Sequence, residues 1–202
     1  MTLRAVHVKE GPMGRPRNFT IDDAEAALLD VFWSKGYEGS AVRDLCAATG
    51  QRPASLYAAF GDKDQMFQAA LRRYLVWIEG HLTPSEDGPD GVRHVLETTA
   101  RLTLADRQRR GCAIINAVAD RENLSPQANA TVHESFERLR QLLRRQVDAS
   151  FAAEPPAGVE AMVNLLVAAT VSIRLLGRAG ASSRDLRSIA AGAVEAFARW
   201  AA

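Results

Sequence analysis

The sequence predicts an all-α fold. Apolar residues recur at helical spacing along nearly the whole chain, and no segment shows the strict alternation of a β-strand. Glycine, proline and cap-forming residues divide this pattern into segments of helix length. The 202 residues, 47% hydrophobic and 24% charged, have the composition of a globular protein. They suffice for one medium domain, or for a small domain followed by a larger one.

The first two helices are predicted from their capping residues. Thr20 can cap the first helix, with Asp23 as its capping-box partner, and Gly36 ends that helix. Ser40 is the expected cap of a short second helix, which Gly50 ends.

The next two helices follow the same logic. Pro53 suits the first turn of a third helix that runs to Phe60. Asp62 and Gln65 form a second capping box before a longer fourth helix, which reaches Leu82 with one apolar face.

A stretch rich in proline, glycine and acidic residues, 83–91, is the clearest linker. It separates an N-terminal domain, 19–82, from a C-terminal domain, 83–202, and residues 1–18 form a flexible arm. Five further helices are expected at 92–105, 112–121, 126–151, 158–178 and 184–201.

The two short helices on either side of Gly50 match the helix-turn-helix plan, in which the second helix lies in the major groove of DNA. Leu45, Leu56 and Phe60 would close a small core with Phe32. The pattern alone fits a general three-helix core equally well, so the identities of the residues must decide.

Those identities are distinctive. The segment GYEGS at 36–40 is followed by DLCAATG at 44–50, SLYAAFGDK at 55–63 and MF at 66–67. Together they resemble the TetR family of bacterial regulators, over residues 19–70. The resemblance implies nine helices, a homodimer, and a C-terminal domain that binds a small-molecule effector. It also implies binding to a palindromic double-stranded operator, by family default as a repressor that the effector releases.

The resemblance assigns roles in DNA binding. Tyr57 and Lys63 would each touch a phosphate, and Ser55 and Ala58 would face base edges or sugars. Arg52, just before the third helix, could reach a guanine or a phosphate. The full set of expected contacts in this domain is Ser40, Arg52, Ser55, Tyr57, Ala58 and Lys63. Gln51 and Arg52-Pro53 depart from the common family pattern, which leaves the operator sequence open.

A short basic arm, residues 14–17, precedes the first helix. Its arginines, Arg15 and Arg17, either enter a narrow minor groove or belong to a solvated tail.

The last two helices resemble the family's dimer interface. The helix at 158–178 is apolar nearly all round and must be covered on more than one side. The final helix carries an apolar stripe formed by Leu186, Ala190, Ala193, Phe197 and Trp200. Packing inside the monomer is the alternative for both.

The middle helices should enclose the effector pocket. The expected apolar lining, which would serve equally as core, is Trp77, Leu96, Thr99, Ile115, Val118, Phe136, Leu139 and Leu143. His133 and Arg174 are the polar residues expected to point inward and orient a ligand.

Cys112 has two interpretations. It follows Gly111 at a predicted helix start, after Arg107, Arg109 and Arg110, and such surroundings favour a reactive thiolate. The Gly111-Cys112 pair resembles a subgroup of the family in which a cysteine here can sense oxidants or electrophiles, so a thiol-sensing repressor is an alternative function. A small buried hydrophobe is the other interpretation.

Other classes of protein fit poorly. The net charge of +1 does not by itself indicate nucleic acid, and two cysteines form neither a disulfide framework nor a metal site. The N-terminus lacks a signal-peptide pattern and the apolar stretch 161–173 is too short to span a bilayer, so we expect a cytoplasmic protein without a membrane partner.

A metal-dependent helical enzyme is the remaining alternative. His94 with Glu97 and His133 with Glu137 suggest a carboxylate-bridged site, but their order and spacing differ from the usual Glu-x-x-His pairs. No phosphate-binding loop, nucleophile elbow or dinucleotide motif is present. We therefore expect no catalytic residues, no metal and no cofactor.

Overall fold

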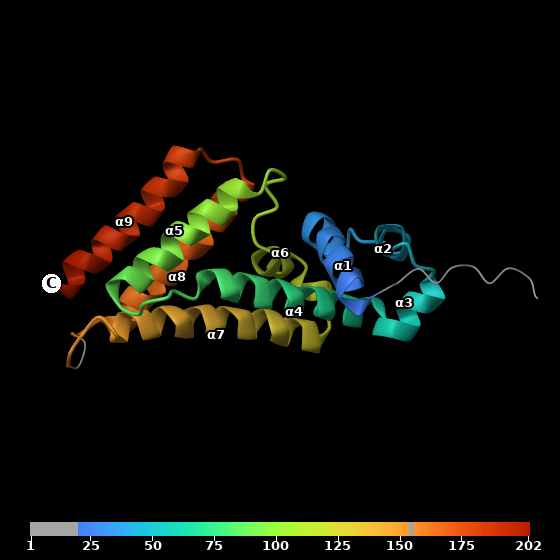
Figure 1. The fold of residues 1–202 in the computed structure, drawn as a ribbon, viewed down its shortest axis with the longest axis horizontal. Coiled ribbons are helices and arrows are strands. Elements are labelled where there is room, and N and C mark those ends of the chain that lie inside the picture. The colour runs from blue at the N-terminus through green and yellow to red at the C-terminus, as the bar shows by residue number, and fades with distance from the viewer. Residues whose placement is uncertain (1–19, 154–155) are drawn as a thin grey trace, which may run out of the picture.

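The computed structural model describes residues 20–153 and 156–202, and within these ranges the chain is all-helical, as predicted. The molecule is elongated, with α1 to α3 at one end and the C-terminus at the other (Figure 1). The described helices are α1 (Ile21–Lys35), α2 (Val42–Thr49), α3 (Pro53–Phe60), α4 (Lys63–Leu82), α5 (Pro89–Ala105), α6 (Ala113–Ala119), the 3₁₀ turn η1 (Arg121–Asn123), α7 (Pro126–Asp148), α8 (Val159–Arg178) and α9 (Ser183–Ala201).

The predicted N-terminal caps form at α1 and α4. The Thr20 hydroxyl accepts a hydrogen bond from the Asp23 backbone N–H at 3.0 Å. Asp62 and Gln65 exchange their side-chain and backbone bonds, both at 2.9 Å, so the second capping box is confirmed.

The expected cap of α2 is wrong. The helix begins one residue later than predicted, after Ala41, whose side chain cannot accept a hydrogen bond. Ser40 is fully buried, and its hydroxyl donates to the Gly36 carbonyl at 2.6 Å instead. The Asp44 carboxylate accepts the Ala41 N–H at 3.3 Å, which satisfies one of the free donors at the helix start.

Several boundaries in the C-terminal part shift by a few residues. α5 begins at Pro89 rather than at 92, because proline fits the first turn of a helix. α6 is shorter than expected and is followed by η1, and α7 ends at Asp148 rather than at 151.

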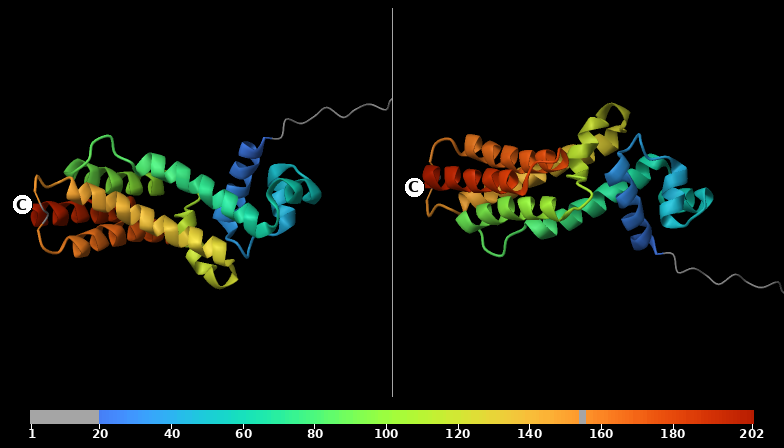
Figure 2. Two further views of the ribbon diagram at one scale, coloured as in Figure 1. Left: turned by 90° about the horizontal axis from the view of Figure 1, so that it is seen from below. Right: turned by 90° about the horizontal axis from the view of Figure 1, so that it is seen from above.

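The long helix α4 joins the two ends of the molecule. Its first part packs against α1, and further along it lies beside α7 and α5 (Figures 1 and 2). Its predicted apolar face is buried, including Phe67, Tyr74 and Ile78. A change in the tilt of α4 would therefore move α1 to α3 relative to the body.

The C-terminal body is formed by α5, α8 and α9 packed on α7 (Figure 2). The stripe predicted for the dimer interface covers this body instead: Leu186, Ala190, Ala193 and Phe197 are buried within the protomer, and Trp200 is partly buried. The buried residues of this stripe are therefore not available to a partner chain.

α8 is covered on one side only. Leu166 and Ile173 are fully buried, whereas Leu165, Leu175 and Leu176 are between 40% and 54% exposed. By length and composition this helix, which extends beyond the stretch 161–173, could also cross a membrane, but a third of its most apolar window is already buried. Exposed apolar patches on a soluble protein usually mark interaction sites.

Candidate DNA-binding surface and effector cavity

The turn between α2 and α3 has the geometry that the sequence predicts. Gly50 adopts a left-handed conformation, with φ of 67°, and Pro53 occupies the first turn of α3. The Thr49 hydroxyl donates to the Leu45 carbonyl at 2.8 Å and accepts the Gln51 N–H at 3.3 Å, which fixes the turn.

α3 presents one face to the protein and the other to solvent. Leu56 is fully buried against the core, and Phe60 is partly buried. The exposed residues are Arg52, Ser55, Tyr57 and Ala58, which are four of the six predicted contacts in this domain. The structure thus brings a guanidinium, two hydroxyls and a small side chain together on one exposed surface, hereafter the α3 face.

Lys63 lies beside this face at the start of α4. Its ammonium nitrogen lies over the Tyr37 ring, 4.4 Å from the ring centroid, and is partly exposed. Burial, with the nearby Asp64, Asp62 and Glu38 carboxylates, raises the pKa of the Tyr37 hydroxyl, so that ring stays neutral beneath the cation.

Three other predicted contacts remain, namely Ser40, Arg15 and Arg17. Ser40 is buried and bonded to Gly36, so its side chain does not reach the surface. Arg15 and Arg17 lie outside the described residues. Sequence reasoning missed Arg43, whose side chain is 91% exposed on the first turn of α2. Its position directly after the helix start could have indicated it.

A small apolar cavity of about 70 Å³ lies between α4, α6, α7 and α8. Four of the residues predicted for the effector pocket line it, namely Ile115, Phe136, Leu139 and Arg174. The cysteine that the sequence singled out, Cys112, lines it as well. Sequence reasoning missed Tyr74 and Thr170, whose periodicity indicates only that they are buried.

The remaining pocket predictions do not line this cavity. Leu96, Thr99 and Leu143 are fully buried in the packing between helices. His133 is exposed on α7, and Trp77 and Val118 are 38% and 46% exposed. Helical spacing alone does not specify which side of a helix faces a cavity rather than the neighbouring helix.

The cavity holds few polar groups. Arg174 is 4% exposed and Tyr74 is fully buried, and neither the Arg174 Nη2 atom nor the Tyr74 hydroxyl has a hydrogen-bond partner among the described residues. Desolvation raises the pKa of Tyr74 well above its usual value, with the Cys112 thiol as a further cause, so the Tyr74 hydroxyl stays protonated. Cys112 itself is half-buried and is the N-cap residue of α6.

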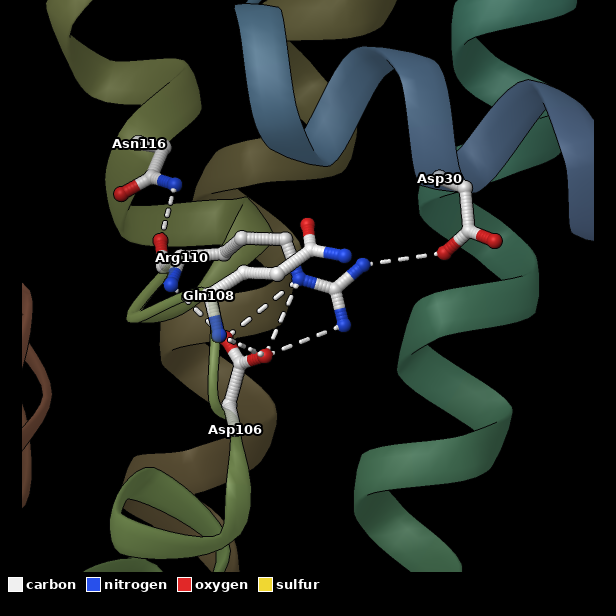
Figure 3. Close-up of polar contacts among 5 residues, drawn as sticks. All are labelled: Asp30, Asp106, Gln108, Arg110 and Asn116. Atoms are coloured by element: carbon white, nitrogen blue, oxygen red, sulfur yellow. Dashed lines mark hydrogen bonds and ion pairs between the residues drawn. The ribbon is translucent and has the colours of Figure 1, made fainter.

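The loop before α6 connects the cavity to α1. The Arg110 guanidinium reaches Asp30 of α1 at 2.9 Å and is also held by Asp106, and Figure 3 shows it extending from the loop between these two carboxylates. The same guanidinium lies over the Trp33 ring, 4.0 Å from its centroid. Asn116 donates to the Arg110 carbonyl at 2.7 Å, which ties the loop to α6 (Figure 3).

Two further hydrogen bonds connect the end of α6 and the loop after it to the N-terminal helices α1 to α4. The Asp120 carboxylate, at the end of α6, accepts the Tyr37 backbone N–H at 2.7 Å. The Ser125 hydroxyl, before α7, donates to Asp64 of α4 at 2.8 Å. Residues 106–125, hereafter the α6 segment, therefore line the cavity and also hold the helices that carry the α3 face.

The described residues contain no group of three or more His, Cys, Asp or Glu side chains placed to hold a metal ion. His94, from one of the suspected pairs, contacts the His81 carbonyl through Nε2 at 2.9 Å. The other pair contains His133, which is exposed.

Comparison with known proteins supports the motif. Residues 26–70 match the family model described as bacterial regulatory proteins, tetR family. The HTH-type transcriptional repressor ComR of Escherichia coli is 42% identical over 62 residues, covering 31% of this chain and 30% of ComR. The repressor BdcR of the same organism is 31% identical over 109 residues, covering 52% of this chain and 55% of BdcR. The chain thus spans about a third of ComR and about half of BdcR.

Solved structures extend the likeness to nearly the whole chain. A cysteine mutant of the TetR-family regulator CifR, complexed with 26-base-pair operator DNA, superimposes with a TM-score of 0.76 at 26% identity, covering 90% of this chain and 99% of that one. A TetR regulator from Chloroflexus aurantiacus shares the fold, with a TM-score of 0.75 at 20% identity, covering 86% and 91%. The described residues therefore form an all-helical fold with an N-terminal helix-turn-helix. The N-terminal helices thus match the TetR family model, and the chain as a whole resembles TetR-family regulators in fold.

We predict that the two carboxylates around Arg110 contribute unequally to stability. Asp106 is 13% exposed and accepts both the backbone and the side-chain N–H groups of Arg110, whereas Asp30 is 74% exposed. Asp106→Ala should lower the free energy of unfolding by about 1–3 kcal/mol, because it leaves buried donors unpaired. Asp30→Ala should cost about 0–1 kcal/mol. Urea denaturation of the two variants measures this difference, and equal losses would contradict it.

Proposed function

We propose that this protein is a ligand-responsive, DNA-binding transcriptional regulator, acting as a cytoplasmic homodimer that represses until an effector releases it from a palindromic operator. The observation that carries the proposal is the α3 face, on which Arg52, Ser55 and Tyr57 are exposed around the buried anchor Leu56. Side chains of these kinds contact the edges of bases and the phosphates of DNA.

The relatives agree with this proposal. ComR and BdcR are named as transcriptional repressors, and the CifR mutant is complexed with operator DNA. Lys63, at the start of the helix after α3, and the exposed Arg43 of α2 would neutralise DNA phosphates. We extend the DNA-contact set to Arg43 and remove Ser40, which is buried.

Dimerisation through the last two helices is supported by what α8 and α9 leave uncovered. Leu165, Leu175 and Leu176 of α8 are exposed, and Gly192 on the exposed side of α9 has open space where a side chain would be. Small residues let two helices approach closely, and leucines supply apolar area. A symmetric dimer would present two α3 helices to successive major grooves, about 34–36 Å apart.

Release by an effector would act through the α6 segment. Cys112 and Ile115 line the cavity, while Arg110 bonds Asp30 of α1 and Asp120 bonds Tyr37 in the turn after α1. A ligand that favours one arrangement of this segment would favour one spacing of the two α3 helices, and DNA affinity would follow that population.

A thiol-sensing regulator is the second candidate function. Cys112 lines the cavity beside Tyr74 and lies in the segment that contacts α1, so a group attached to its sulfur would occupy the same space as an effector. With a maleimide, the thiol would add across the ring's double bond, forming a carbon–sulfur bond while the proton goes to the neighbouring carbon.

The DNA proposal predicts tight, salt-sensitive binding that depends on the α3 face. In fluorescence anisotropy with the DNA upstream of its own gene, Tyr57→Ala should weaken binding about tenfold or more, because a hydrogen bond to a charged group contributes about 1.5–3 kcal/mol. Arg43→Gln should lower the slope of log K against log salt by about one. Val76→Ala, an exposed change on α4, is the matched control.

Wild-type binding no tighter than to random DNA would exclude this operator and call for selection from a random DNA library. Failure to select any sequence would overturn the regulator proposal.

The dimer proposal predicts that charge on the exposed face of α8 separates the protomers. The double variant Leu165→Glu with Leu176→Glu should raise the dimer dissociation constant at least about a hundredfold, since an unpaired buried charge costs several kcal/mol. Sedimentation equilibrium measures this constant. Val76→Glu, equally an exposed apolar residue, should leave it unchanged. A double variant that stays dimeric would place the interface elsewhere.

The thiol proposal predicts that operator release by N-ethylmaleimide requires Cys112. Wild type and Cys46→Ser should both lose DNA affinity on treatment, whereas Cys112→Ser should keep it, with mass spectrometry reporting the sites modified. A Cys112→Ser variant that releases DNA as wild type does would rule this function out.

A further inference from the structure

We propose that the cavity binds the carboxylate of a small apolar monocarboxylic acid, with Arg174 as its ion-pair partner and Tyr74 as a second hydrogen-bond donor. This inference rests on the proposed function, because it assigns a chemical class to the effector. It begins from a guanidinium that is buried without a counter-charge.

Arg174 is the group that requires an anion. Its side chain, on α8, is 4% exposed, and its Nη2 atom has no hydrogen-bond partner in the described part of the chain. None of the ion pairs within residues 20–153 and 156–202 involves Arg174. A buried charge is costly unless it is paired, and a guanidinium matches the two oxygens of a carboxylate.

Tyr74 supplies a second donor in the same cavity. Its hydroxyl, which stays protonated, is buried and has no partner among the described residues. The other hydroxyls on the lining are already used, because Ser135 donates to the Thr131 carbonyl and Thr170 to the Leu166 carbonyl. Two unpaired donors in one apolar cavity match a ligand head group that only accepts hydrogen bonds, as a carboxylate does.

The rest of the lining specifies the ligand body. The walls are otherwise mainly aliphatic and aromatic, including Ile78, Phe136 and Leu139, and the lining contains no aspartate, glutamate, lysine or histidine. The site therefore carries one positive charge, on Arg174, which matches a ligand with a single negative charge. The cavity volume of about 70 Å³ is well below the roughly 300–1,000 Å³ of pockets for larger ligands. A short branched or single-ring acid suits this space better than a long acyl chain.

A dimer partner would not supply the missing counter-charge. Of the exposed leucines of α8, Leu165 and Leu176 lie about half a helical turn away from Arg174, on the opposite side of the helix, and Leu175 lies between these two directions. Arg174 is already enclosed within one protomer, so its partner must be small enough to enter the cavity.

The head group would lie close to the DNA-binding unit. The Tyr74 ring packs edge-to-face on Trp33 of α1, with ring centroids 4.9 Å apart. A carboxylate that draws the Tyr74 hydroxyl towards Arg174 would change the surface on which α1 rests.

The test compares acids with their uncharged amides, using the full-length protein. Isovalerate and benzoate should raise the melting temperature of the wild type and bind at least thirtyfold more tightly than isovaleramide and benzamide in isothermal titration calorimetry. Arg174→Met should abolish the preference for the acids, while melting at or above the wild-type temperature without ligand, because it removes an unpaired buried charge. Tyr74→Phe should weaken acid binding about tenfold and keep the preference.

Each contrary result is decisive. Equal binding of acids and amides, no binding of either acid to the wild type, or an unchanged acid preference in Arg174→Met would overturn the inference. The acid–amide comparison needs no variant, so a misfolded Arg174→Met protein does not remove the test. Operator binding measured on the same wild-type sample separates the two proposals: DNA binding without acid binding removes only this inference, and acid binding without DNA binding removes only the regulatory function.

Discussion

The position of Trp33 is the constraint on which the arrangement of the molecule depends. Its indole contacts both the Tyr74 ring of α4, edge-to-face with centroids 4.9 Å apart, and the Arg110 guanidinium, 4.0 Å from the ring centroid. One neighbour reaches the cavity with its hydroxyl, and the other belongs to the α6 segment. Because α1 contacts Tyr74 and Arg110 through this one side chain, helices α1 to α3 cannot change their orientation without disturbing these two contacts.

This arrangement explains why α6 is short and bounded by irregular backbone. Arg109, before the helix, has a positive φ of 53°, and Gly111 has φ of 76°. A side chain at Gly111 would come within 3.2 Å of Arg178 on α8, so the loop and α8 lie in close contact. The loop thereby lies between α8 and α1, and a regular helix through it could not reach both.

The sequence predicts the local structure better than the site. Capping residues act on backbone groups three positions away, so Thr20 and Asp62 could be assigned from spacing alone, and the buried face of α4 follows from its period. The cap expected at Ser40 does not form, because the serine hydroxyl has a competing partner, here the Gly36 carbonyl, that only the folded turn supplies.

Long-range packing accounts for the other differences. His133 and Arg174 look alike as single polar residues in apolar helices, yet one is exposed and the other is enclosed, and this depends on how α7 and α8 are rotated against their neighbours. Likewise, Ala190 and Ala193 of α9 predict close approach to another helix without indicating whether that helix belongs to the same chain, and here both are buried in the protomer's own core. The exposed face of α3 was predicted well because its motif includes the residue that anchors it, Leu56.

The distribution of aromatic side chains provides the protein with an optical reporter. Of its three tryptophans, Trp33 and Trp77 lie side by side where α1 rests on α4, with ring centroids 6.0 Å apart, and Trp77 also contacts the His81 ring. Trp200 lies at the far end of the body against Phe151. Ultraviolet emission from the unlabelled chain therefore comes from two indoles at the joint between its halves and one remote from it. Movement at that joint alters the surroundings of the first two and leaves the third as an internal reference.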